Sequence, residues 1–272
     1  MDLSVCMIVK NEQETLSRAL SSVQPIADEI VVVDTGSTDS TKEIASKFTD
    51  KIYDFKWSDD FAAARNCSLD HATKSMILWL DADDFIPEKS AEKIAEINAS
   101  NCMDGYFFNI LNINPCRPDL VHTEPFRQFR MFPNISGLRF EGKIHESIYP
   151  KCKELGIKMS IADVLIEHHG YKNPAIMTEK IKRNNRLLSS TFGFSSDVKF
   201  YEFDCGNYYC LFAESGLLIW EDFHLVFSNV IPETSIPDVK QRARIEIERL
   251  GVFQNNIEVN KSINRFADKR LT

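Results

Sequence analysis

The sequence predicts an α/β protein with a doubly wound, Rossmann-like mixed sheet, followed by an α-helical region. Apolar segments typical of buried strands recur at 3–9, 29–33, 51–55 and 76–80. Segments with apolar residues at helical spacing separate them, at 12–23, 38–48 and 61–72. Strands separated by helices of about 10 to 15 residues imply βαβ units, which build parallel sheets through right-handed crossovers.

The first strands and the first helix show both periodicities. Residues 3–9 form an apolar run, which is typical of a strand buried on both faces. Helix 12–23 carries its apolar residues at helical spacing, and Pro25 ends it. Strand 29–33 is rich in β-branched residues and leads to Gly36, which permits a tight turn into the next helix.

Composition indicates a globular enzyme. The chain has 272 residues, of which 43% are hydrophobic and 26% charged, as is usual for packed proteins. This length suits a catalytic domain at 1–172 and a smaller helical region at 173–272. The net charge of −8 argues against a non-specific nucleic-acid binder, because phosphate contacts need clustered Lys and Arg.

Cysteine usage and the amino terminus predict a cytoplasmic protein. The seven cysteines are scattered without a C-x-x-C pair, which favours reduced thiols over a disulfide framework. A catalytic cysteine is the alternative. The apolar run at 3–9 is too short for a signal-peptide core, and no apolar run is long enough to span a membrane.

An acidic tetrapeptide, Asp81-Ala82-Asp83-Asp84, directly follows the apolar strand 76–80. Open α/β sheets bind ligands at the carboxyl ends of their strands. Three carboxylates crowded there repel one another unless protons or a cation neutralise them. Hard oxygen ligands suit Mg²⁺ or Mn²⁺, which commonly accompany a substrate's phosphates. An Asp-rich turn without a ligand is the alternative interpretation.

Other polar residues follow the first and second strands. Asn11 and Glu12 come after strand 3–9, and Asp34 ends strand 29–33. Taken singly, Asn11 could cap a helix and Asp34 could form an Asx-turn. Since carboxyl ends of parallel strands share one edge of the sheet, we expect these residues and the acidic tetrapeptide to line one crevice.

The middle of the chain predicts two more strands, at 104–113 and 126–132. Arg127 and Arg130 lie three residues apart in the second of these, on opposite faces of a regular strand. One of them could face the crevice. A solvated arginine on an edge strand is the alternative for each.

Four segments together resemble family-two glycosyltransferases, in order and spacing, over roughly residues 1–100. They are Leu3–Glu12, Ile30–Asp39, Ala64–Asn66 and Leu78–Asp84. The resemblance implies a glycosyltransferase A fold, a nucleotide-sugar donor with UDP favoured, a Mn²⁺ or Mg²⁺ ion and inversion at the anomeric carbon. The implied reaction moves a hexose-type sugar to a peptide, protein or glycan acceptor.

Residues 57–66 are most similar to a bacterial subgroup of this family that often carries tetratricopeptide-type helices after the catalytic domain. Some relatives in that subgroup glycosylate peptides, including S-linked bacteriocin modification. The expected helical region, with helices at 176–188, 200–218, 218–230, 238–250 and 255–266, could be a degenerate version of such helices. It could grip a peptide acceptor or form a homodimer.

The resemblance also assigns residues to the donor and the metal. Asp34 is expected to accept from the nucleotide base, and Arg65 to lie near the base or a phosphate. Asp83, with Asp81 and the downstream His168, is expected to hold the cation; His169 matches the family's H-x-G-Y pattern less well. The full set of nucleotide-sugar contacts implied is Val9, Asn11, Glu12, Asp34, Arg65, Asp81, Ala82 and Asp84.

An inverting transfer needs a general base beside the acceptor nucleophile. The resemblance places it at Glu146, within a catalytic set that includes Asp83 and His145. Glu141 and His145 are the other candidates for the base, because His145-Glu146 departs from the more common Glu-Asp pair of the family. A Glu in a surface hairpin is the alternative interpretation.

Competing functions fit the sequence less well. A nucleotidyltransferase usually carries a Gly-rich, basic loop after its first strand, where this chain has Lys10-Asn11-Glu12. A haloacid-dehalogenase-like phosphatase carries D-x-D-x-T after its first strand, whereas here the aspartates follow the fourth. A non-catalytic nucleotide-binding or helical-repeat interaction protein derived from the same fold remains the main alternative.

Overall fold

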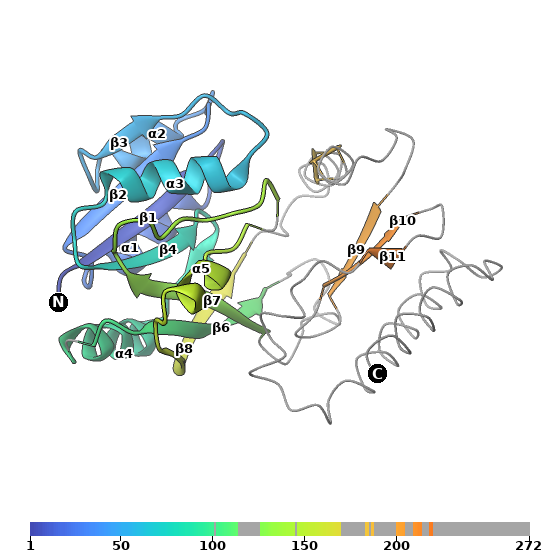
Figure 1. Cartoon of the computed structure of the whole chain (residues 1–272). Helices are drawn as coiled ribbons and strands as arrows, with labels where there is room; N and C mark the ends of the chain where they lie inside the picture. The colour runs from blue at the N-terminus through green and yellow to red at the C-terminus, as the bar shows by residue number, and fades with distance from the viewer. Residues whose placement is uncertain are drawn as a thin grey trace, which may run out of the picture. The chain divides into compact units, whose positions relative to one another are not determined.

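The computed structural model describes residues 1–100, 102–113, 126–144 and 146–169, with short stretches at 183–184, 186–187, 200–204, 209–213 and 218–219. The chain divides into two compact units, Met1–Met177 and Thr178–Thr272 (Figure 1). The expected domain boundary between residues 172 and 173 stays a prediction.

An eight-stranded mixed sheet forms the first unit, in the order β3-β2-β1-β4-β7-β6-β8-β5. Its strands are β1 (Leu3–Val9), β2 (Glu29–Asp34), β3 (Ile52–Asp54), β4 (Met76–Asp81), β5 (Asp84–Phe85), β6 (Gly105–Asn112), β7 (Phe126–Pro133) and β8 (Met159–His168). The first four strands are parallel, whereas β7 runs antiparallel to both β4 and β6. The predicted mixed α/β sheet is confirmed.

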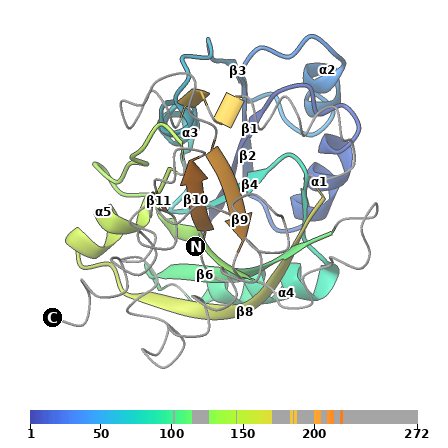
Figure 2. The same cartoon turned by 90° about the vertical axis from the view of Figure 1, so that its right-hand side faces the viewer.

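Helices cover both faces of this sheet. They are α1 (Leu16–Val23), α2 (Thr41–Ala45), α3 (Phe61–His71), α4 (Glu88–Ala99) and α5 (Tyr149–Glu154). The apolar sides of α1 and α4 pack into one core with the inward residues of β1 and β4. The thiol of Cys6, which alternates with those β1 residues, instead faces α3. Figure 2 shows α4 lying along β6 and β8.

Local sequence explains these elements. The β1, β2 and β4 segments are nearly continuous apolar runs because both of their faces are covered by helices. Helix α1 buries four residues at helical spacing: Leu16, Ala19, Leu20 and Val23. Asp60 directly precedes helix α3. Its carboxylate accepts a hydrogen bond from the Ala63 amide and so caps the amino end of the helix.

The parallel register brings the predicted polar residues to one edge of the sheet. Val9 of β1 pairs with Asp34 of β2, and Ile8 pairs with Asp81 of β4. Asp34 and Asp81 therefore end neighbouring strands at the same level. The expected placement of these carboxylates along one carboxyl edge is confirmed.

Two irregular pairings complete this edge. Phe107 of β6 pairs with Phe129 and Tyr106 pairs with Met131, so Arg130 is an extra residue in β7 and forms a bulge. On the far side, the short strand β5 pairs Asp84 with His168 at the end of β8. A residue more than 80 positions downstream is thereby brought beside the acidic tetrapeptide.

The described part of the second unit forms a three-stranded antiparallel sheet of β9 (Phe200–Asp204), β10 (Tyr209–Ala213) and β11 (Leu218–Ile219). The expectation of a helix over 200–218 is therefore wrong. The segment is rich in Phe and Tyr, which favour strands. Residues 183–184 and 186–187 are helical, within the helix expected at 176–188. The helices expected beyond residue 219 lie outside the described residues.

Among the residues described, no helix combines the length and the apolar character that a membrane crossing requires.

Candidate functional site

Two carboxylates and an imidazole converge where β4, β5 and β8 end. One ligand atom from each of Asp81, Asp84 and His168 lies within 4.8 Å of the others. His168 Nδ1 is 2.9 Å from Asp84 Oδ1 and 3.4 Å from Asp83 Oδ1. Carboxylate oxygens with an imidazole suit Mn²⁺ and, less well, Mg²⁺. The donor set therefore fits a divalent cation.

Backbone hydrogen bonds fix the acidic turn. The Asp81 amide donates to Asp84 Oδ2 at 2.9 Å, so the tetrapeptide folds back on itself. The His169 amide donates to the Asp83 carbonyl at 2.9 Å, which ties the end of β8 to the turn. The Asp84 side chain is fully buried, whereas that of Asp81 is 31% exposed. Asp81 is thus the more accessible of these two carboxylates.

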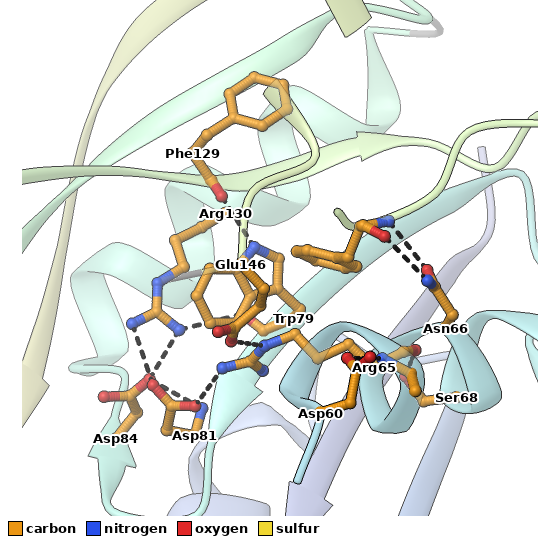
Figure 3. A network of polar contacts seen from close by, with 12 residues as sticks. Asp60, Arg65, Asn66, Ser68, Trp79, Asp81, Asp84, Phe129, Arg130 and Glu146 are labelled. Atoms are coloured by element: carbon orange, nitrogen blue, oxygen red, sulfur yellow. Dashed lines mark hydrogen bonds and ion pairs between the residues drawn. The ribbon is translucent and has the colours of Figure 1, made fainter. Parts of the chain in front are cut away.

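Two arginines meet over the indole of Trp79 (Figure 3). The guanidinium carbon of Arg65, from α3, lies 4.0 Å from the ring centroid, and that of Arg130, from the β7 bulge, lies 3.8 Å from it. The indole N–H donates to the Phe129 carbonyl at 2.7 Å, which fixes the ring against β7. Trp79 therefore serves as a rigid, apolar platform for both cations.

The arginines share Asp81 between them. Arg65 Nη2 donates to Asp81 Oδ1 at 2.9 Å, and Arg130 Nη2 lies 3.5 Å from Asp81 Oδ2. Arg130 Nη1 also pairs with Asp84 Oδ2 at 2.9 Å. Both arginine side chains are under 10% exposed, so these ion pairs are largely shielded from water.

Glu146 joins this network from the opposite side of Arg65. Its Oε1 accepts from Arg65 Nε at 2.5 Å, and its side chain is 11% exposed. The nearby bridge between Glu141 and Ser147 closes the loop that carries it. Arg65 consequently links Glu146 to Asp81, although the two carboxylates lie 65 residues apart in the sequence.

These contacts shift the protonation of the cluster. Partial burial opposes ionisation of Asp81, but Arg65, Arg130 and His168 together hold its pKa well below the usual range. Burial alone would lower the pKa of His168, yet the surrounding Asp83, Asp84 and Asp81 carboxylates raise it to about 9. At neutral pH His168 is therefore protonated and Asp81 ionised when no cation is bound.

The Asp34 carboxylate lies on the neighbouring strand of the same edge. Its Oδ2 accepts from the amides of Gly36 and Ser37 at 3.0 and 2.9 Å, which is the geometry of an Asx-turn. Its Oδ1 is buried with no hydrogen-bond partner in the described part of the chain. A buried carboxylate oxygen without a donor is costly, so this atom is suited to accept from a ligand.

The loop after β1 packs against the loop after β2. Asn11 adopts a left-handed backbone with φ of 54°, and its Oδ1 accepts from the Thr38 amide at 2.8 Å. The Glu12 amide donates to Thr41 Oγ1 at 2.8 Å. Asn11 thus joins the two loops, and Gly36 between them has a φ of 105°, which glycine adopts readily.

The other predicted residues divide into three groups. Val9 and Ala82 are buried, and the Val9 carbonyl accepts from the amide and the hydroxyl of Thr35. Asp83 lies beside His168 but outside the three-residue cation grouping. His145 lies outside the described residues. The functional roles assigned to all these residues stay predictions.

The sequence alone did not show that Arg130, rather than Arg127, lies at the acidic turn. A regular strand would put Arg127 and Arg130 on opposite faces with equal claims on the crevice. The bulge, which sends Arg130 to the acidic cluster, leaves no composition signal in the sequence. The available hint was that Arg130 lies between Phe129 and Met131, which are both apolar.

Comparisons with known proteins agree with this architecture. A family model for glycosyl transferase family 2 matches residues 4–164. The glycosyltransferase SunS of Bacillus subtilis is 31% identical over 189 residues, which is 66% of this chain and 43% of SunS. A TPR repeat-containing protein of Synechococcus elongatus is 37% identical over 147 residues, 54% of this chain and 35% of that protein. The chain thus spans less than half the length of these two relatives.

A solved structure shares the fold. The crystal structure of S. aureus TarS 1–349 in complex with UDP-GlcNAc matches with a TM-score of 0.51 and 16% identity, over 89% of this chain and 79% of that one. This likeness bears on the fold alone and agrees with the expected glycosyltransferase A type. Because the family model covers more than half of the sequence, the chain belongs to glycosyl transferase family 2.

Proposed function

We propose that this protein is an inverting glycosyltransferase that moves a hexose-type sugar from a nucleotide donor to a peptide, protein or glycan. The observation that carries the proposal lies at one edge of a family-2 domain. There a buried Asp34 oxygen that has no partner among the described residues shares the edge with the Asp81–Asp84–His168 group. UDP is the proposed nucleotide. The resemblance of the motifs supports it, and so does the UDP-GlcNAc in the TarS structure of similar fold.

We assign the donor's parts to the two halves of this edge. Asp34 Oδ1 accepts from the base, because it is a buried acceptor to which no group in the described part of the chain donates. Asp81, Asp84 and His168 hold a Mn²⁺ or Mg²⁺ ion, and Asp83 supports them through His168. When bound, such an ion neutralises the diphosphate as the glycosidic bond breaks.

Glu146 is the proposed general base. Its Oε1 is held by Arg65, so Oε2 is the oxygen that takes the proton from the acceptor's hydroxyl or thiol. Arg65 holds this carboxylate in one orientation, with Trp79 beneath the guanidinium. The bond to Arg65 fixes the position of Glu146, and proton transfer from a bound acceptor requires such positioning.

The test is donor turnover. Wild-type protein should release UDP from one UDP-sugar in the presence of Mn²⁺, with water or an added peptide as acceptor. Replacing Glu146 by Gln preserves its shape and should lower turnover by about 10²- to 10⁴-fold while donor affinity stays within about threefold, because only the proton acceptor is removed. Glu141→Gln is the matched control, because Glu141 lies in the same loop and pairs with Ser147 through a single β-bridge.

A turnover in Glu146→Gln equal to wild type would place the base elsewhere, and Glu141→Gln would then be the variant that loses activity. No UDP-sugar binding by any of these proteins would contradict the donor assignment itself and favour a non-catalytic protein of the same fold. The cytoplasmic location and a homodimer through the second unit remain further proposals.

A further inference from the structure

Arg130 is a buried cation that is paired with two carboxylates of the acidic turn. Its side chain is 1% exposed, and it occupies the extra position of the β7 bulge. Its Nε is buried without a hydrogen-bond partner among the described residues, whereas Nη1 contacts Asp84 and the Trp79 carbonyl and Nη2 contacts Asp81. Burying an arginine is unfavourable unless carboxylates compensate it. The bulge directs the guanidinium of Arg130 towards the Asp81–Asp84 turn.

The carboxylates that compensate Arg130 are the ones grouped with His168. Arg130 Nη1 lies 2.9 Å from Asp84 Oδ2, and Nη2 lies 3.5 Å from Asp81 Oδ2. Asp84 presents its other oxygen, Oδ1, to His168 at 2.9 Å. Each carboxylate of the candidate cation site is therefore already paired with a guanidinium. A divalent cation entering there would meet a fixed positive charge on its own ligands.

We propose that Arg130 is a built-in counter-ion, that is, a positioning residue that holds Asp81 and Asp84 in place when no divalent cation is bound. Its charge weakens cation binding to these carboxylates. When a cation binds, the ion pair between Arg130 and Asp84 is partly broken. This inference rests on the proposed cation site but not on the identity of the sugar or the acceptor. It assigns a role to a residue that the donor and acceptor chemistry does not touch.

Electrostatics predicts whether cation affinity rises or falls when the charge of Arg130 is removed. Coulomb energies fall with distance and are larger where water is excluded, so a guanidinium in contact with a ligand carboxylate opposes a doubly charged ion strongly. Deleting the charge leaves Asp81 paired with Arg65 and Asp84 paired with His168, each with one cationic partner fewer, so the two carboxylates attract a cation more. A residue that merely supported the ligands would have the opposite effect, since its loss would loosen the site and weaken binding.

The experiment compares Mn²⁺ affinities by calorimetry, without nucleotide, in wild type and three variants. Arg130→Met keeps length and packing on Trp79 but removes the charge, and should bind Mn²⁺ at least about tenfold more tightly. Arg130→Lys keeps the charge and should stay within about threefold of wild type. Arg127→Met makes the same charge change three residues away on β7 and should match wild type.

Equal or weaker Mn²⁺ binding by Arg130→Met overturns the proposal, and so does a failure of that variant to bind Mn²⁺ at all. The nucleotide assignment is judged separately, by UDP binding in EDTA and in Mn²⁺. A protein that binds UDP but whose Arg130→Met variant gains no Mn²⁺ affinity would contradict the counter-ion role and leave the proposed function standing.

A second measurement covers the case in which Arg130→Met does not fold. In a Trp57→Phe, Trp220→Phe background, Trp79 is the single tryptophan of a chain that has three. Arg130 stacks on the Trp79 ring, so a loosened ion pair between Arg130 and Asp84 should shift the Trp79 fluorescence emission when Mg²⁺ saturates the site. Mg²⁺ is used because it is not paramagnetic and does not quench the fluorescence. Unchanged emission, once calorimetry shows Mg²⁺ bound, would contradict the proposal.

Discussion

Each edge of the parallel strands holds a buried carboxylate, but the two are built in opposite ways. At the amino edge, Glu29 accepts from the Ser4 hydroxyl, from Lys51, and from both the amide and the hydroxyl of Thr73, the last two at 2.7 Å. At the carboxyl edge, Asp34 keeps one buried oxygen to which no described residue donates. Folding alone explains a carboxylate that is fully satisfied. It does not explain one that is left half-satisfied.

The same contrast holds for charge. Glu29 is 3% exposed, and its charge is balanced by one lysine. The carboxyl edge instead gathers Asp81, Asp83, Asp84 and Glu146 against two arginines and His168. We infer that the amino edge serves stability and that the carboxyl edge serves binding.

The largest effect is expected from breaking the amino edge. Glu29→Ala removes a buried ion-pair partner and leaves the donors of Ser4 and Thr73 unsatisfied. The free energy of unfolding should fall by about 3–5 kcal/mol, with UDP affinity unchanged in the folded protein. Urea denaturation measures this loss. Glu92→Ala, at an exposed position on α4, should change stability by no more than about 0.5 kcal/mol.

Acid should reproduce part of that loss. Desolvation opposes ionisation of Glu29, but Lys51, Ser4 and Thr73 lower its pKa from 4.5 to about 2. Its stabilising contribution is therefore complete above pH 4.5 and is lost as the pH falls towards 2. Wild-type protein that lost no more stability over this range than Glu29→Ala would contradict the assignment.

A smaller effect is expected from pH at the carboxyl edge. Since the surrounding aspartates raise the pKa of His168 to about 9, a cation that uses this imidazole must displace its proton. Mn²⁺ affinity should therefore rise by about tenfold per pH unit between pH 6.5 and 8.5. Calorimetry in buffers of different ionisation enthalpy counts the proton released. A flat profile would exclude His168 as a ligand, and His168→Asn should flatten it.

The sequence predicted the parts of the fold that depend on local pattern. Strands β1, β2 and β4 and helices α1 and α3 follow from apolar periodicity, and the carboxyl-edge placement of Asp34 and Asp81 follows from parallel pairing. Helix α4 was not anticipated, although it buries Ala91 and Ile94 at helical spacing. The strands at 200–204 and 209–213 were mistaken for helix, although their Phe and Tyr residues favour strands.

The site was predictable where residues follow strands and unpredictable where they depend on irregular pairing. Asp84 meets His168 only because the two-residue strand β5 pairs with the end of β8. Arg130 meets Asp84 only because β7 is bulged. Neither feature has a sequence period, since each depends on how distant strands align. The ion pairs of Arg65 with Asp81 and Glu146 likewise join segments that no local pattern connects.

The most direct test of the binding role of the carboxyl edge is calorimetry of UDP, GDP, CDP and ADP in Mn²⁺ and in EDTA, with wild type, Asp34→Ala and Asp54→Asn. Asp54 pairs with Asp34 in the sheet but its side chain is 75% exposed, which makes it the matched control. We expect wild type and Asp54→Asn to bind one nucleotide equally, and folded Asp34→Ala to bind it about 100-fold more weakly. Equal binding by all three proteins, or binding of no nucleotide by wild type, would contradict the account.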